Sequence, residues 1–168
     1  MTKKKPAQKP LVSDNRKARH DFFIEDKFEA GLELLGWEVK SARAGTVNLQ
    51  DSFIYFEIKK GGDGVVEAVL KNAHFSPFQF GDVNTQVVRR DRKLLLNRSE
   101  ISKLHNGVKT KGFTCVATKI YFNKKGLVKL EIALAKGKQN YDKKQTLKER
   151  DIARDTARET LTALSKKM

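Results

Sequence analysis

Two apolar runs in the C-terminal half of the chain constrain its fold more than any other feature. In the second run, every other residue is a large aliphatic one: Val128, Leu130, Ile132 and Leu134. A period of two directs alternate side chains to the same face, as in a half-buried strand. The turn-forming residues 123–126 separate this run from the apolar run 113–122. The sequence therefore predicts an antiparallel hairpin over residues 113–135.

Two other regions carry strand patterns. Residues 28–34 alternate apolar side chains with charged or small ones, which predicts a half-buried strand. Residues 51–59 and 65–72 are apolar runs on either side of the glycine-rich segment 61–64. A phosphate-binding glycine loop is one interpretation of that segment, but its position between two strands favours the turn of a second hairpin.

Two short helices are predicted between the strands. Residues 37–44 form one helical segment, which Gly45 can end. Asn97 followed by Glu100 three residues later is typical of a helix start, and Gly107 can end this second helix.

These elements define a fold class. Five or more short strands with two small helices fit a mainly β protein better than a layered α/β fold. We expect an OB-fold-like barrel, closed or partly open, in which residues 74–84 form an irregular connection.

The charge is concentrated at the two ends of the chain. The formal net charge is +15, and residues 1–20 carry seven Lys or Arg against one Asp. Residues 136–168 carry ten basic and five acidic residues, whereas residues 21–135 hold all ten Phe and the single Trp. The core therefore lies in the middle, and the basic ends call for a polyanionic partner, of which a nucleic acid is the usual example.

An anionic membrane is the competing partner, but the sequence does not favour it. The chain has no long apolar segment, and no apolar region follows the basic residues 1–10 as it would in a signal peptide. We therefore expect no membrane association and a cytoplasmic protein.

The domain organisation follows from this charge pattern. We predict a basic flexible arm over 1–14, an OB-like RNA-binding barrel over 15–138 and a basic tail over 139–168. Residues 146–149 match a capping box, and neither Pro nor Gly interrupts residues 139–168. The apolar residues of the tail would form only a narrow stripe on a helix, so we expect the tail to be disordered when free and helical on its partner. A merely solubilising tail is the alternative.

Catalytic chemistry is not indicated. The three histidines lack metal-ligand spacing, and Cys115 lies in an apolar run that predicts a buried thiol. Four carboxylates could hold Mg²⁺ in a nuclease, but alternating acids on a strand more often form its solvated face: Glu29, Glu33, Glu38 and Asp51. We expect no enzyme, no cofactor and no metal site.

A cluster of cations precedes the second helix: Arg89, Arg90, Arg92 and Lys93. Such a run is commonly a solvated surface, and a strip that follows RNA phosphates is the sharper interpretation. The high net charge favours the phosphate strip.

Residues 15–26, 28–53, 92–97 and 133–151 carry sequence runs by which the chain resembles the SmpB family. The resemblance implies an OB-fold barrel that binds the tRNA-like domain of transfer-messenger RNA. It also implies delivery of that RNA to stalled 70S ribosomes for trans-translation, without catalysis by the protein. A general RNA-binding or ribosomal protein is the alternative.

Site residues follow from the same resemblance. It implies RNA contacts at Asn15, Glu29 and Leu95, with Lys17, Arg43 and Lys93 as phosphate partners. A carboxylate such as Glu29 can accept hydrogen bonds from base amino groups or a 2′-hydroxyl. Leu95 offers an apolar surface for an unstacked base, and at least one of Leu94, Leu95 and Leu96 is expected in the core.

The resemblance also assigns the tail to the ribosomal decoding site and the empty mRNA channel. The residues implied are Lys136, Lys138, Tyr141, Asp142, Lys143, Lys144, Lys148 and Arg150. Lys144 stands where the family commonly has Arg, which keeps the charge and loses the planar fork of a guanidinium.

Overall fold

The computed structural model describes residues 11–58, 65–78 and 86–139, together with Asp142 and Thr156. The chain divides into two units, Met1–Lys136 and Gly137–Met168, and the first contains most of the described residues. None of the helices in this described part is both long enough and apolar enough to cross a membrane.

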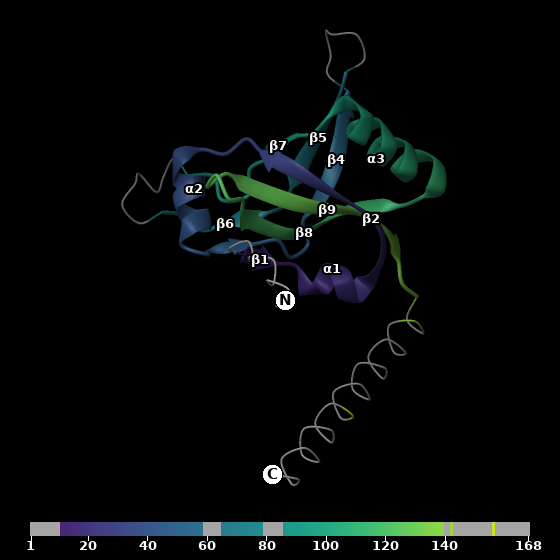
Figure 1. Ribbon diagram of the computed structural model, residues 1–168, viewed down its shortest axis with the longest axis horizontal. Helices are drawn as coiled ribbons and strands as arrows, with labels where there is room; N and C mark the ends of the chain where they lie inside the picture. The colour runs from purple at the N-terminus through teal and green to yellow at the C-terminus, as the bar shows by residue number, and fades with distance from the viewer. Residues whose placement is uncertain (1–10, 59–64, 79–85, 140–141, 143–155, 157–168) are drawn as a thin grey trace, which may run out of the picture. The chain divides into compact units, whose positions relative to one another are not determined.

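Six strands form a closed barrel (Figure 1). They are β2 (Phe22–Leu32), β4 (Phe53–Ile58), β5 (Val66–Lys71), β7 (Arg92–Leu95), β8 (Thr114–Phe122) and β9 (Val128–Gly137). Neighbours follow the order β8-β4-β5-β7-β2-β9, and pairing of β9 with β8 closes the ring. The predicted mainly β barrel is confirmed, and of the two forms expected it is the closed one.

Both predicted hairpins are present. In β8 and β9, Cys115 lies opposite Leu134 and Phe122 opposite Val128. Gly126 has a φ of +75°, which a turn between them requires. β4 and β5 pair antiparallel along their whole lengths, while the connection 59–64 lies outside the described residues.

The N-terminal part of the described chain differs from the prediction. Residues 11–14, expected in the flexible arm, form β1 (Leu11–Asp14), which pairs antiparallel with β8. The strand expected over 28–34 is β2, and it starts six residues earlier at Phe22 and ends at Leu32. Its first half shows no clean alternation because residues 25–27 are all charged, so periodicity could not reveal it.

Within the described residues, three helices flank the barrel. α1 (Arg16–Asp21), which the sequence did not predict, contacts β8 and β2. α2 (Gly36–Arg43) matches the first predicted helix and is followed by Gly45 at a φ of +72°. α2 and α3 (Arg98–Lys111) lie at opposite ends of the barrel in Figure 1.

The second predicted helix, α3, is correct at its start and wrong at its end. The Glu100 carboxylate accepts a hydrogen bond from the Asn97 N–H at 2.9 Å, as a capping box requires. The helix continues through Gly107 to Lys111 and ends at Gly112, whose φ is +64°. A Cβ at Gly107 would lie 2.5 Å from the Leu134 side chain, so this glycine permits close packing of α3 on β9.

The remaining short strands are β3 (Val47–Asn48) and β6 (His74–Phe75), which pair with each other. β6 falls within the connection that was predicted to be irregular. Residues 79–85 of that connection lie outside the described residues.

Apolar side chains from almost every strand fill the barrel. Its largest fully buried apolar members are Leu49, Leu70, Phe75, Leu104, Ile120, Leu130 and Ile132. A smaller cluster joins Ala18 of α1 to Val116, Ala133 and Ala135 of β8 and β9. Cys115 is buried in β8 as predicted, and burial raises the pKa of its thiol to about 12, so it stays protonated at neutral pH.

Candidate nucleic-acid interface

Neighbouring residues of strand β7 differ in burial: alternate side chains lie in the core and at the surface. Arg92 and Leu94 are buried, at 0% and 2% exposure, while Leu95 is 55% exposed and Lys93 is partly exposed. The expectation that at least one of the three leucines 94–96 lies in the core is therefore confirmed by Leu94. Leu95 and Lys93 remain available to a partner.

Four of the six predicted RNA contacts lie together. Glu29, Lys93 and Leu95 line a hollow of about 470 Å³, and Leu95 and Arg43 line an adjoining hollow of about 440 Å³. Lys129, which was not predicted, lines both. We call this region the Leu95 surface; β2, α2, β7 and β9 contribute its residues.

Glu29 is a fixed hydrogen-bond acceptor on this surface. Its carboxylate accepts a hydrogen bond from the Tyr121 hydroxyl, and its Oε1 lies 3.8 Å from the Lys129 Nζ. The side chain of Glu29 is still 43% exposed. It can therefore meet a base amino group or a 2′-hydroxyl without leaving its partners in the protein.

Lys93 is paired with a neighbouring acid. Its Nζ lies 2.7 Å from Glu67 Oε1, and this hydrogen bond, assisted by the carboxylate charge, raises the pKa of Lys93 above its ordinary value. A lysine is protonated at neutral pH even at its ordinary pKa, so the pairing with Glu67 adds no charge. A phosphate approaching it would share the cation with Glu67.

Leu127 extends the apolar part of the Leu95 surface. It lies on the β8–β9 turn, is 57% exposed and lines the same hollow as Leu95 and Arg43. Sequence reasoning missed both Leu127, on the turn, and Lys129, on β9, because nothing in the sequence shows that these residues fold beside β7. The combination of apolar side chains with cations at the rim suits a base with its flanking phosphates.

The other two predicted contacts, Asn15 and Lys17, line a separate hollow of about 320 Å³ with Asp51, which we call the Asn15 surface. Lys17 Nζ lies 2.7 Å from Asp51 Oδ1, and this bond raises the pKa of Lys17. Asn15 is only 6% exposed.

The polar atoms of the Asn15 side chain serve the fold. Its Nδ2 donates to the carbonyls of Leu49 and Ala117, at 2.8 and 2.9 Å, and its Oδ1 accepts from the Ala18 N–H at 3.0 Å. The side chain thus caps α1 and ties that helix to the barrel. The RNA contact assigned to Asn15 stays a prediction, and the geometry gives this side chain a structural role.

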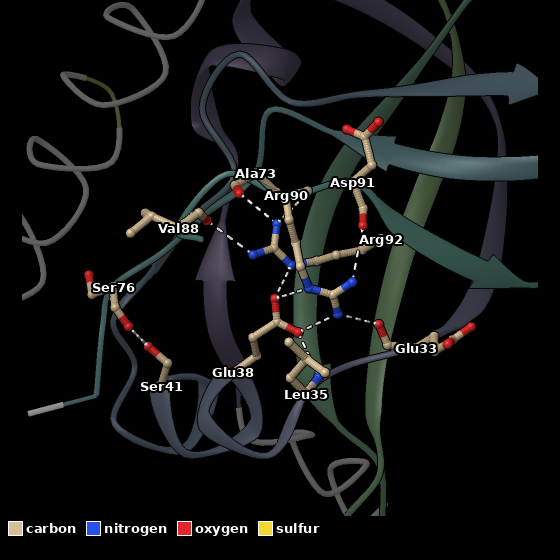
Figure 2. Close-up of polar contacts among 10 residues, drawn as sticks. All are labelled: Glu33, Leu35, Glu38, Ser41, Ala73, Ser76, Val88, Arg90, Asp91 and Arg92. Carbon is tan, nitrogen blue, oxygen red and sulfur yellow. Dashed lines mark hydrogen bonds and ion pairs between the residues drawn. The ribbon is translucent and has the colours of Figure 1, made fainter. Parts of the chain in front are cut away.

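The interpretation of residues 89–93 as a phosphate strip is wrong for Arg92 (Figure 2). Arg92 has no exposed area, and its Nε donates to Glu38 Oε1 at 2.8 Å. Burial lowers the pKa of Arg92 and the Glu38 charge opposes that change. The sequence held only a partial signal: a strand that buries Leu94 also buries Arg92, two residues earlier, but the sequence did not show which of the leucines 94–96 is buried.

The carboxylates considered for Mg²⁺ lie apart. Glu38 is buried against Arg90 and Arg92, Asp51 pairs with Lys17, and Glu29 bonds to Tyr121. Within the residues that the structure describes, no three His, Cys, Asp or Glu side chains gather to hold a metal ion. The nuclease alternative therefore has no assembled site in this part of the chain.

Three predicted tail residues lie among the described ones. Lys136 is exposed near the end of β9, and Lys138 follows that strand. Asp142 Oδ2 accepts from the Gln139 N–H at 3.3 Å. The other five tail calls fall outside the described residues: Tyr141, Lys143, Lys144, Lys148 and Arg150.

A closed β-barrel whose surface combines cations, a fixed acceptor and exposed leucines defines the class of small oligonucleotide-binding barrels. The model of one family, described as SmpB protein, matches residues 12–162. The chain belongs to the SmpB family.

Individual relatives agree with this assignment. The SsrA-binding protein of Symbiobacterium thermophilum is 50% identical over 147 residues, which cover 88% of this chain and 89% of that protein. The SsrA-binding protein of Pseudomonas putida (strain GB-1) is 47% identical over 161 residues, 94% of each chain. A solved chain described under "tmRNA-SmpB: a journey to the center of the bacterial ribosome" is 41% identical, with a TM-score of 0.62. The match covers 82% of this chain and 94% of the solved one.

Proposed function

We propose that this protein binds the tRNA-like domain of transfer-messenger RNA and delivers it to ribosomes stalled without a stop codon. The observation that carries the proposal is family membership over residues 12–162, with SsrA-binding relatives that are 50% and 47% identical. The solved chain at 41% identity comes from work on transfer-messenger RNA and SmpB in the bacterial ribosome.

The Leu95 surface supplies the chemistry for this binding. Arg43, Lys93 and Lys129 neutralise phosphates, which releases counterions and drives association. Leu95 and Leu127 cover the face of an unstacked base, and Glu29 accepts hydrogen bonds that bulk positive charge cannot supply. Together these groups favour a folded RNA with a splayed base over a uniform duplex.

The Asn15 surface extends the contact in the proposal. Lys17 would meet a second stretch of phosphates, while Asn15 holds α1 and thereby places Lys17. Because Lys17 already pairs with Asp51, this contact contributes less than those of the Leu95 surface.

The protein acts here as a binding partner and catalyses no reaction. The family is one of RNA-binding proteins, and the RNA itself supplies the alanylated acceptor and the reading frame for the degradation tag. In this proposal the protein acts in the cytoplasm, where ribosomes translate, and it requires neither a cofactor nor a membrane.

Residues 139–168 form a separate functional part in this proposal. The tail, preceded by Lys136 and Lys138, engages the decoding site and the empty mRNA channel through the basic positions named above. Deleting the chain from Gln139 onward should leave RNA binding intact and abolish peptide tagging on stalled ribosomes in a reconstituted translation system. Loss of RNA binding in the same truncated protein would show that the two functions are not separable.

The decisive experiment is binding to transfer-messenger RNA across a salt series with ordinary tRNA as competitor. Nonspecific electrostatic binding weakens steeply with salt, so selectivity that persists at physiological salt supports the proposal. Equal binding to both RNAs that disappears with salt would instead support the alternative, a general RNA-binding or ribosomal protein.

A further inference from the structure

Three charged residues form a polar group inside the protein: Glu38, Arg90 and Arg92, here called the Glu38 cluster (Figure 2). The side chains of Glu38 and Arg92 have no exposed area, and that of Arg90 is 27% exposed. Glu38 Oε1 accepts from the Nε of Arg90 at 2.9 Å and of Arg92 at 2.8 Å. Glu38 Oε2 accepts from Arg90 Nη2 at 2.7 Å.

The cluster also bonds to the backbone of four segments. The backbone partners are the carbonyls of Glu33, Ala73 and Val88 and the N–H of Leu35, at distances of 2.7 to 3.1 Å. These groups lie just after β2, just after β5, before β7 and at the start of α2. One ion cluster thus joins the adjacent ends of β2 and α2 to the end of β5 and the start of β7, which lie far along the chain from them.

Three of these elements carry the Leu95 surface. β2 carries Glu29, α2 carries Arg43, and β7 carries Lys93 and Leu95. Arg92 is the immediate neighbour of Lys93 in β7. Any shift of the Arg92 backbone therefore moves Lys93 and Leu95 relative to Arg43.

The physical chemistry of the cluster suits positioning more than stabilisation. Replacing a buried ion pair by apolar groups of similar size is often neutral or favourable, so such a pair is weak evidence for stability. A guanidinium holds five N–H donors in a rigid plane, so it fixes the directions of the hydrogen bonds that it donates. Arg92 uses its donors on Glu38 and three carbonyls, and its Cζ lies over the ring of Phe75, 4.1 Å from the ring centre.

We propose that Glu38, Arg90 and Arg92 are positioning residues for RNA binding. They set the distance between Arg43 on α2 and Lys93 and Leu95 on β7, and they do not touch the RNA. This inference rests on the proposed function, because it concerns the same surface. It assigns a role to two arginines that the run of cations in the sequence had suggested as phosphate contacts.

The test compares Arg92→Lys, which keeps the charge and loses the planar fork, with the full-length wild-type protein. Lys93→Met reports the removal of a cation at the surface, and Arg98→Lys is the matched control, at an exposed residue at the start of α3. Affinity for transfer-messenger RNA is measured at several salt concentrations, with tRNA as competitor, at a temperature where circular dichroism shows every variant folded.

We expect Arg92→Lys to weaken binding about tenfold, because the network loses hydrogen bonds that hold its geometry. The preference for transfer-messenger RNA over tRNA should fall as well, while the slope of log K, the logarithm of the binding constant, against log salt stays at the wild-type value. Lys93→Met should reduce that slope by about 0.7 to 0.9, the share of one phosphate. Arg98→Lys should bind as the wild type does.

Two results would overturn the inference. A folded Arg92→Lys protein with wild-type affinity and selectivity would show that the cluster is only structural. A reduced slope in Arg92→Lys would show that the arginine reaches phosphate. If Arg92→Lys does not fold, Arg90→Lys, at the partly exposed member of the cluster, is held to the same two criteria. Absence of tRNA discrimination in the wild type would count against the proposed function instead.

Discussion

The Leu95 surface and the Asn15 surface differ in how the protein uses the side chains predicted to meet RNA. On the Leu95 surface, Leu95 is 55% exposed and Glu29 is 43% exposed despite its partners. On the Asn15 surface, Asn15 is 6% exposed and its amide bonds three backbone groups. A residue can therefore matter for RNA binding either as a contact or as a support, and its partners within the protein distinguish the two roles.

The largest expected effect tests the supporting role of Asn15. Asn15→Ala removes the cap of α1 and the amide that donates to the carbonyls of Leu49 and Ala117, of which Leu49 keeps the hydrogen bonds it accepts from Ser52. We expect a loss of about 2 to 4 kcal/mol in the free energy of unfolding, summed from a lost cap and lost buried hydrogen bonds. Urea denaturation followed by circular dichroism measures it.

Asn106→Ala is the control for that change, since Asn106 is exposed on α3. An exposed substitution of this kind should alter stability by no more than about 0.5 kcal/mol. The opposite result is that Asn15→Ala is as stable as the wild type but defective in RNA binding. It would show that Asn15 contacts the RNA directly and that the two surfaces do not differ in this way.

The second effect tests Glu29 as a direct contact. Glu29→Arg removes an acceptor and places a cation beside Lys129, so we expect affinity for transfer-messenger RNA to fall by about 1 to 3 kcal/mol despite the added positive charge. Glu25→Arg makes the same charge change at an exposed position of the same strand and should not weaken binding. Equal affinity of the two variants would show that only net charge counts on this surface.

The smallest effect measures what the Asn15 surface adds through charge. Lys17 already pairs with Asp51, so its replacement by Met should change affinity only slightly. If Lys17 meets a phosphate, the slope of log K against log salt should still fall by about 0.7 to 0.9 in Lys17→Met. An unchanged slope would leave the Leu95 surface as the place where phosphates bind and give the Asn15 surface a supporting role alone.

The sequence by itself determined the features that depend on neighbouring residues. Alternation in 127–135 defined a strand that is β9, and Asn97 with Glu100 defined the start of α3, because strand faces and helix caps involve residues a few positions apart. The net charge of +15 indicated a polyanionic partner without reference to any fold. The mainly β barrel followed from the count and spacing of these local elements.

Only the tertiary structure decided which polar residues are exposed. Arg92 and Lys93 are adjacent and equally basic in the sequence, yet Arg92 is buried because Glu38 of α2, 54 residues earlier, pairs with it inside the protein. Asn15 bonds to Ala117 across 102 residues, and Leu127 reaches the Leu95 surface only because the barrel closes. The burial of a charge or an amide requires a partner, and a partner brought close by folding leaves no trace in the local pattern of the chain.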